Sequence, residues 1–182
     1  MRSEGSKTIT LVLGGARSGK SRYAQKLASA FQRVTFIATA RASDSEMLRK
    51  IAEHRRQRPA SWRTCEAPVN LEAAIRTEGG RADVLLIDCL TVFLANIMNA
   101  KKGGPAKALD RIQRVCDAIQ STKASVLVVS NEVGSGVVPP FRSGRIYRDL
   151  LGELNQRIAE IADRVVLMIA GVPVAIKDGA AL

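Results

Sequence analysis

Aromatic residues are scarce in this sequence. Phe, Trp and Tyr make up 4% of the 182 residues, and they are too scattered to form a stacking surface for nucleic-acid bases. Hydrophobic residues nevertheless reach 46% of the chain. The core must therefore consist mainly of Val, Ile, Leu and Ala, which is typical of a parallel sheet covered by helices.

Cysteines are few, and long apolar runs are absent. Cys65, Cys89 and Cys116 form no C-x-x-C pair and have no metal-ligand spacing, so we expect reduced thiols in a cytoplasmic protein. No apolar run reaches the roughly 18 residues of a membrane span, and residues 1–7 lack the apolar core of a signal peptide. We predict a flexible extension over 1–7, one domain over 8–182 and no membrane span.

Acidic residues are fewer than basic residues. The 28 Lys and Arg outnumber the 17 Asp and Glu, which gives a net charge of +11. Many of the basic residues lie between Arg41 and Arg63. Such a charge suits either a nucleic acid or a phosphate-rich small molecule. The shortage of aromatic residues favours the small molecule, so we predict no nucleic-acid partner.

A phosphate loop of the pattern G-x-x-x-x-G-K-[ST] lies near the N-terminus. It consists of Gly14, Gly15, Ala16, Arg17, Ser18, Gly19, Lys20 and Ser21. An apolar strand over 8–13 precedes it and a helix from Arg22 onward follows it, as the motif requires. Its N–H groups would bind phosphate oxygens, Lys20 would reach the β- and γ-phosphates, and Ser21 would contact Mg²⁺. Arg17 is either a solvated side chain or a further phosphate contact.

The chain alternates between short apolar strands and amphipathic helices. We predict strands over 8–13, 34–38, 62–66, 84–88, 125–129, 165–170 and 174–177. We predict helices from 22 onward and over 43–57, 71–76, 90–98, 106–120 and 146–162. In the helix 106–120, Leu109 should face the core together with Ile112, Val115 and Ile119. This order predicts an α/β fold with a mostly parallel sheet, helices on both faces and an antiparallel edge strand.

Asp88 follows four apolar residues, Val84–Ile87. The pattern resembles the strand that places a Mg²⁺-associated Asp beside a phosphate loop in nucleotide hydrolases and kinases. Alternatively, Asp88 simply caps the helix that starts near Leu90. Because a phosphate loop is present, the metal or substrate role is favoured.

His54 is the single histidine of the chain. A lone histidine on a helix is usually an ordinary surface or core residue. Here it shares a helix face with Met47 and Ile51 and precedes Arg55-Arg56-Gln57-Arg58, a cluster able to bind phosphates. A neutral imidazole is also a competent nucleophile at phosphorus.

Further motifs accompany the phosphate loop along almost the whole chain. They are Glu53-His54-Arg55, Arg58-Pro59, Trp62-Arg63-Thr64 with Glu66, Asn131-Glu132-Val133-Gly134 with Pro139, Arg148-Asp149, Asn155-Gln156 and Gly171-x-Pro173-x-x-Ile176-Lys177. Together these motifs resemble the bifunctional adenosylcobinamide kinase / adenosylcobinamide-phosphate guanylyltransferases of cobalamin synthesis.

The resemblance implies two reactions. A nucleoside triphosphate, ATP or GTP, phosphorylates the hydroxyl of adenosylcobinamide, and GTP then transfers GMP to that phosphate through a histidine, which His54 matches. It also implies a RecA-like nucleotide-binding domain that assembles as a homotrimer. Beyond the phosphate loop, the family's nucleotide contacts match Ala38, Thr39, Ala40, Arg55, Arg56, Gln57, Arg58, Glu66 and Asp88.

Two other functions remain compatible with the residues themselves. One is a kinase of another small metabolite, in which His54 is merely structural and no covalent GMP forms. The other is a RecA-like ATPase that binds nucleic acid, whose activity would depend steeply on salt.

Overall fold

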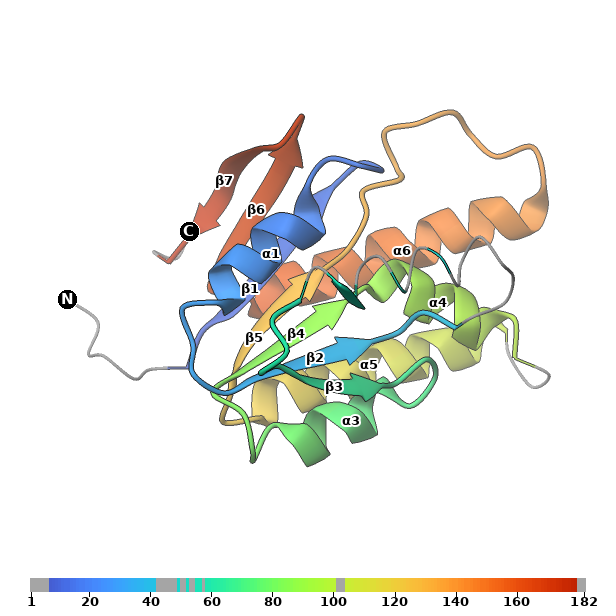
Figure 1. The fold of residues 1–182 in the computed structure, drawn as a ribbon. Helices are drawn as coiled ribbons and strands as arrows, with labels where there is room; N and C mark the ends of the chain where they lie inside the picture. The colour runs from blue at the N-terminus through green and yellow to red at the C-terminus, as the bar shows by residue number, and fades with distance from the viewer. Residues whose placement is uncertain are drawn as a thin grey trace.

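The computed structural model describes residues 7–41, 49, 52, 55–56, 58–100 and 104–179. Over this part of the chain, one sheet of seven strands has the order β3-β2-β4-β5-β1-β6-β7 (Figure 1). Neighbouring strands are parallel except β6 and β7, which are antiparallel. The strands are β1 (Ile9–Gly14), β2 (Val34–Ala38), β3 (Arg63–Glu66), β4 (Val84–Asp88), β5 (Ser125–Val129), β6 (Arg164–Ile169) and β7 (Val172–Asp178).

Helices cover both faces of this sheet. One face packs against α1, and the other packs against the layer formed by α3, α4, α5 and α6 (Figure 1). None of the described helices combines the length and the apolarity needed to cross a membrane. The helices are α1 (Lys20–Ala28), α3 (Leu71–Glu78), α4 (Leu90–Met98), α5 (Pro105–Ser121) and α6 (Arg142–Ile161).

Side chains along each central strand alternate between the two faces. In β4, Val84 and Leu86 belong to the apolar cluster beneath α1. Leu85 and Ile87 belong to the larger cluster beneath the other helices. A strand buried on both faces reads as a continuous apolar run, which is why the strands were visible in the sequence. The alternation places the side chain of Asp88, the last residue of β4, on the α1 face.

The predicted α/β fold with a mostly parallel sheet is confirmed, including the antiparallel edge strand. The bounds of β2, β4, β5 and α4 coincide with the predicted ranges. The first helix begins at Lys20 rather than Arg22, so the last two residues of the phosphate-loop motif are already helical. The helix predicted over 43–57 falls largely outside the described residues, although Arg55 and Arg56 are described as helical.

One residue predicted to lie in the core is not buried. Leu109 of α5 is 37% exposed, whereas its neighbour Ala108 is 2% exposed. The buried face of α5 consists of Ala108, Ile112, Val115, Cys116, Ala118 and Ile119. Both residues fit the 3.6-residue period of the helix, so the sequence pattern favoured the larger apolar side chain for the core. Close packing against α3 and α6 instead favours the smaller side chain on the inner side of the helix.

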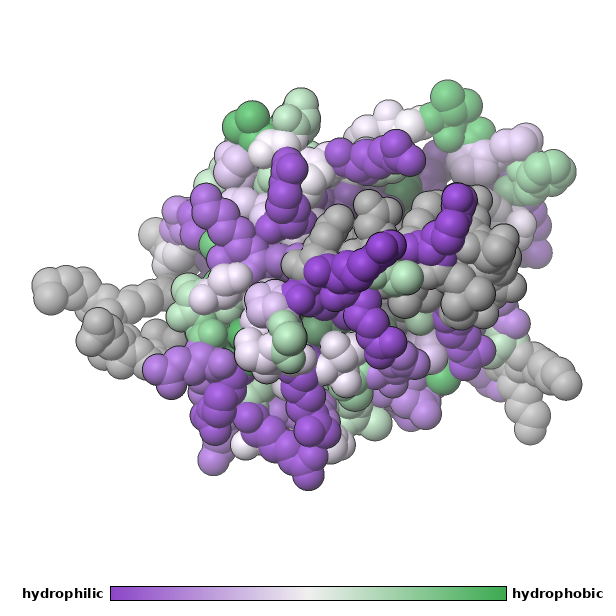
Figure 2. Space-filling view, in the orientation of Figure 1, coloured by the Kyte–Doolittle hydropathy of each residue, from purple (hydrophilic) through white to green (hydrophobic). Residues whose placement is uncertain are grey.

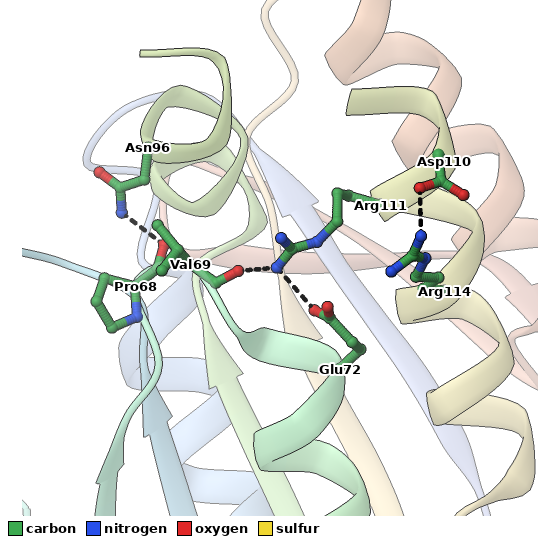
Figure 3. A network of polar contacts seen from close by, with 7 residues as sticks. All are labelled: Pro68, Val69, Glu72, Asn96, Asp110, Arg111 and Arg114. Atoms are coloured by element: carbon green, nitrogen blue, oxygen red, sulfur yellow. Dashed lines mark hydrogen bonds and ion pairs between the residues drawn. The ribbon is translucent and has the colours of Figure 1, made fainter. Parts of the chain in front are cut away.

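The loop between β3 and α3 is held by side chains from the helix layer (Figure 3). Asn96 of α4 donates through Nδ2 to the carbonyl of Pro68 at 3.0 Å. Arg111 of α5 donates through Nη2 to the carbonyl of Val69 and to Glu72 Oε2, the latter at 3.1 Å. Because these donors satisfy carbonyls of an irregular segment, they fix the path of the chain as it leaves β3.

Replacing Arg111 should therefore cost more stability than replacing an exposed arginine of the same helix. We expect Arg111→Met to lower the free energy of unfolding by about 1.5–3 kcal/mol, because it leaves the Val69 carbonyl and the Glu72 carboxylate without their charged donor. Arg114, which pairs with Asp110 at 2.7 Å on the surface, provides the control. Arg114→Met should cost only about 0.3–0.5 kcal/mol. Urea denaturation measures both values, and equal losses would contradict the role of Arg111.

Candidate active site

The phosphate loop lies between β1 and α1 and has the backbone geometry that its glycines permit. Gly19 has a φ of 95° and Gly14 a φ of 147°, both in the region that favours glycine. A Cβ at Gly14 would come within 2.6 Å of the Met168 carbonyl oxygen on β6. Glycine is therefore required at this position for the loop to lie against the neighbouring strand.

Two backbone hydrogen bonds attach this loop to other segments. The N–H of Gly171, in the turn between β6 and β7, donates to the Ser18 carbonyl at 3.0 Å. The N–H of Glu132, just after β5, donates to the Gly14 carbonyl at 3.1 Å. The loop is thus supported from both neighbouring strands through its carbonyls, and these two bonds use none of its own N–H groups.

Lys20 is only 8% exposed, although it begins a surface helix. Its ammonium donates to the Gly15 carbonyl and, at 3.4 Å, to Ser18 Oγ, so it lies folded over the loop. Burial lowers the pKa of Lys20, and the nearby acidic groups of Cys89 and Asp88 partly oppose that effect. A polyanion at this position would stabilise the charged ammonium and raise the pKa again.

The loop borders a cavity of about 700 Å³. Its lining combines residues 16–22 with Asp88, Cys89, Val129 and Asn131. The volume lies within the usual range for sites that hold one small ligand. The cavity therefore brings together the cation of Lys20, the hydroxyl of Ser21 and the carboxylate of Asp88, as the motifs predicted.

The strand order explains why Asp88 lies near the loop without crowding it. Asp88 is in register with Val129 of β5, and Val12 of β1 is in register with the same residue. One strand thus separates β4 from β1, a spacing of about 10 Å across the sheet. Asp88 does not cap α4, because Cys89 occupies the N-cap position of that helix.

Ser21 and Asp88 supply the type of ligands that Mg²⁺ prefers. Both are oxygen donors, and both line the same cavity. No group of three or more His, Cys, Asp or Glu side chains able to hold a metal occurs among the described residues. The donor set therefore fits a cation that keeps water and substrate ligands, as Mg²⁺ does, and does not fit an all-protein metal cage.

The predicted contacts Ala38, Thr39 and Ala40 lie beside Asp88 but are not part of the cavity lining. Thr39 is fully buried. Its hydroxyl donates to the Cys89 carbonyl at 2.8 Å and accepts from the Cys89 N–H at 2.8 Å. The hydroxyl therefore joins β2 to the start of α4. The Thr39 N–H donates to the Asp88 carbonyl and the Thr39 carbonyl accepts from Asn96 Nδ2, so Thr39 has a structural role, whereas Ala38 and Ala40 are partly exposed.

The predicted basic cluster is described only in part. Arg55 lies 3.8 Å from Glu66 in an exposed ion pair. The guanidinium of Arg58 stacks over the Phe36 ring, 3.3 Å from its centroid. Burial lowers the pKa of Arg58, whereas the charge of Asp88 raises it. Arg56 is exposed.

The strand register relates this cluster to the cavity. Ala38 is in register with both Glu66 and Asp88, so the three residues form a row at the carboxyl edge of the sheet. Phe36, on which Arg58 stacks, belongs to the cluster beneath α1. Arg58, Glu66 and Asp88 thus share the edge and the face that carry the phosphate loop. His54 and Gln57 lie outside the described residues.

Sequence reasoning missed Asn131 as a residue of the cavity. Its N–H donates to Thr91 Oγ1 on α4 at 2.9 Å, and its carbonyl accepts from Asn155 Nδ2 on α6 at 3.0 Å. Both backbone groups of Asn131 are therefore fixed by buried or half-buried side chains. The available signal was its place directly after a buried strand, but only the strand order shows that this strand lies between β1 and β4.

Comparison of the sequence with known families gives a consistent result. The family described as cobinamide kinase / cobinamide phosphate guanyltransferase matches residues 10–176. The chain is 44% identical over 168 residues to the bifunctional adenosylcobalamin biosynthesis protein CobP of Pseudomonas aeruginosa, covering 92% of this chain and 96% of that protein. It is 40% identical over 180 residues to the bifunctional adenosylcobalamin biosynthesis protein CobU of Salmonella typhimurium, covering 93% of this chain and 99% of that protein.

Comparison with solved structures shows the fold alone. An ATPase of the type III secretion system of pathogenic bacteria superimposes with a TM-score of 0.55 and 11% identity, covering 92% of this chain and 56% of that one. A protein from Pyrococcus horikoshii OT3 superimposes with a TM-score of 0.56 and 7% identity, covering 94% of this chain and 86% of that one. The predicted class of nucleotide-binding fold is thus supported at the level of architecture.

Lys20→Ala should weaken the binding of nucleoside triphosphates by about 10- to 150-fold, which corresponds to about 1.5–3 kcal/mol for a charged hydrogen-bond donor. Isothermal titration calorimetry with ATP and GTP measures the change. Lys26→Ala is the matched control, because Lys26 is an exposed lysine on the same helix and does not line the cavity. If both variants bound triphosphate as the unmodified protein does, the cavity would not be the nucleotide site.

Proposed function

The chain belongs to the cobinamide kinase / cobinamide phosphate guanyltransferase family, and we propose that the cavity beside Lys20 is where it binds the nucleotides for both reactions. As a member of this family, the protein is a bifunctional kinase and guanylyltransferase of cobalamin biosynthesis. The observation that carries the site proposal is the shared cavity lined by Lys20, Ser21 and Asp88.

In the kinase reaction, the acceptor hydroxyl of adenosylcobinamide attacks the γ-phosphorus of ATP or GTP. The O–P bond to the acceptor forms as the bond to the nucleoside diphosphate breaks, and the hydroxyl proton is lost to solvent or a base. Little covalent chemistry is required of the protein in such a transfer, so position and charge dominate. The N–H groups of the loop and the ammonium of Lys20 would hold the phosphates and stabilise the negative charge that develops on them.

Mg²⁺ would be held by Ser21 and Asp88 together with phosphate oxygens. When bound, it supplies positive charge that stabilises the transferring phosphate and the leaving group. Asp88 also contributes negative charge beside Lys20, which partly opposes the lowering of the lysine pKa by burial.

For the guanylyl transfer, we propose that His54 is the first nucleophile. Direct attack of the cobinamide phosphate on GTP would bring two anions together, whereas a neutral imidazole avoids that repulsion. The imidazole nitrogen forms a bond to the α-phosphorus and pyrophosphate leaves. An oxygen of adenosylcobinamide phosphate then attacks the same phosphorus, which releases the histidine and gives adenosylcobinamide-GDP.

The described neighbours of His54 support this role through their location. Arg55 pairs with Glu66, and Arg58 stacks on Phe36, at the edge of the sheet that carries Asp88. The basic segment that follows His54 therefore lies on the same face as the phosphate loop, where it would neutralise a transferring phosphate. We propose Arg55, Arg56, Gln57, Arg58, Glu66 and the segment Ala38, Thr39 and Ala40 as further nucleotide contacts.

The covalent intermediate provides the sharpest test. GTP labelled at the α-phosphate should leave label on the protein through a phosphorus–nitrogen bond, which is labile in acid and persists in alkali. His54→Asn should abolish the label and the guanylyl transfer, because the amide is not a nucleophile at phosphorus. Its kinase activity should survive, since that step needs no covalent nucleophile.

Arg49→Ala provides the control for this experiment, because Arg49 is an exposed residue of the same segment and is not among the proposed contacts. It should label at the rate of the unmodified protein. Label in the His54→Asn variant at the normal rate would reject His54, and an unlabelled wild-type protein that makes adenosylcobinamide-GDP would reject the covalent route.

We further propose that the protein is a cytoplasmic homotrimer that binds small molecules and no nucleic acid. The proposal of a trimer comes from the family resemblance and is supported by the edge of the sheet. On β7, Val172, Val174 and Ile176 are exposed apolar residues. An exposed apolar edge strand is a ready site for association with another chain.

Sedimentation at micromolar concentration should therefore give three times the 19.6 kDa mass of one chain. Ile176→Lys should shift the distribution toward single chains, because it places a charge among the exposed apolar residues of β7. Leu109→Lys, an exposed leucine on α5, should leave the distribution unchanged. A wild-type species of only one chain mass would contradict the trimer.

A further inference from the structure

The loop between β5 and α6 carries an exposed apolar run. Val137, Val138, Pro139, Pro140 and Phe141 are consecutive, and all but the half-buried Pro139 are exposed. Val137 is 94% exposed, Val138 58% and Phe141 76%. Consecutive apolar residues held in water are unfavourable for solubility, so such a run indicates a surface with a binding role.

This loop begins at the active site. Asn131, which follows β5, lines the nucleotide cavity, and the next N–H, that of Glu132, donates to the Gly14 carbonyl of the phosphate loop. In Figure 1 the loop, drawn in orange, leaves the sheet close to the phosphate loop and passes over α6 before that helix begins. The apolar run therefore lies in the same loop as a residue of the cavity lining, a few residues further along the chain.

Both ends of the loop are anchored. Near its start, the N–H of Glu132 donates to the Gly14 carbonyl at 3.1 Å, and within the loop the N–H of Gly134 donates to Glu132 Oε1 at 2.6 Å. Near its end, Arg145 Nη1 donates to the carbonyls of Pro139 and Pro140 at 3.1 and 2.8 Å. Two adjacent prolines restrict the backbone further. An anchored loop loses little conformational entropy when it binds a ligand, so the apolar run is suited to ligand contact.

The volume of the cavity indicates which of the two substrates must bind outside it. A cavity of about 700 Å³ holds one small ligand, and a nucleoside triphosphate bound to the phosphate loop fills that role. The acceptor is a broad, rigid macrocycle with methyl groups on its faces and neutral amides at its edge. Its ring must therefore bind outside the cavity while its hydroxyl arm reaches the γ-phosphate.

We propose that Val137, Val138 and Phe141 form the apolar contact surface for the corrin ring of the acceptor substrate. The inference rests on the proposed location of the nucleotide site. Figure 2 shows the apolar residues of this loop at the upper rim, separate from the apolar residues over the β6–β7 hairpin and divided from them by hydrophilic side chains. The two apolar surfaces are thus distinct, and the one on the loop that starts at Asn131 is the one we assign to the substrate.

A double variant tests the proposal. Val137→Ser with Phe141→Ser removes two exposed apolar side chains, and serine suits Phe141's position as the capping residue of α6, so folding is not impaired. Equilibrium dialysis of cobinamide, followed by its visible absorbance, measures the dissociation constant. We expect at least a tenfold increase, equal to about 1.4 kcal/mol. The affinity for ATP should change by less than twofold.

Two matched variants serve as controls. Val137→Ile with Phe141→Leu keeps the surface apolar and should retain cobinamide affinity. Leu109→Ser removes an exposed leucine from α5 and should also retain it. In the kinase assay, the double serine variant should raise the KM for cobinamide and leave kcat nearly unchanged.

Unchanged cobinamide affinity in the double serine variant would overturn the proposal. So would a loss of affinity that appears only together with dissociation of the oligomer in sedimentation, because the run would then contact a second copy of the chain. Reduced cobinamide affinity in the double serine variant, together with normal triphosphate binding in Lys20→Ala, would support the proposal and contradict the location of the nucleotide site. The two failures are thus distinguishable.

Discussion

The pairing of β1 with β5 on one side and β6 on the other is the constraint on which the rest of the site depends. Parallel strands in register end at the same edge, so the segments that follow them meet there. The phosphate loop follows β1, Asn131 follows β5, and the β6–β7 turn contacts the loop from the other side. Asp88 joins them because β4 pairs with β5 in the same register.

Many polar side chains at this edge hold the backbone rather than face a ligand. Thr39 uses its hydroxyl on Cys89, while Thr91 and Asn155 fix the main chain of Asn131. Their role follows from a general requirement that buried polar groups find partners. It also explains why so few side chains reach the cavity: the irregular segments after the strands need partners of their own.

The sequence was sufficient for the elements and for the residues with the clearest chemistry. Buried strands are continuous apolar runs, and the phosphate loop requires glycines at fixed positions, so both were recognised without structure. Asn131 belongs to a motif found in the sequence, but its place in the cavity could not be predicted, because it depends on β5 lying between β1 and β4, and strand order is a property of long-range pairing. The burial of Ala108 in place of Leu109 similarly depends on how closely two helices pack.

The turn between β6 and β7 has a further consequence. Ala170 and Gly171 both have positive φ, as a tight two-residue hairpin turn requires. A Cβ at Gly19 would lie 3.4 Å from the Gly171 Cα, so the turn packs directly on the phosphate loop. Short surface turns are ordinarily the places where a chain accepts inserted residues, tags or new termini. Here the length of the hairpin is limited by the nucleotide site itself, and circular permutation would have to open the chain elsewhere.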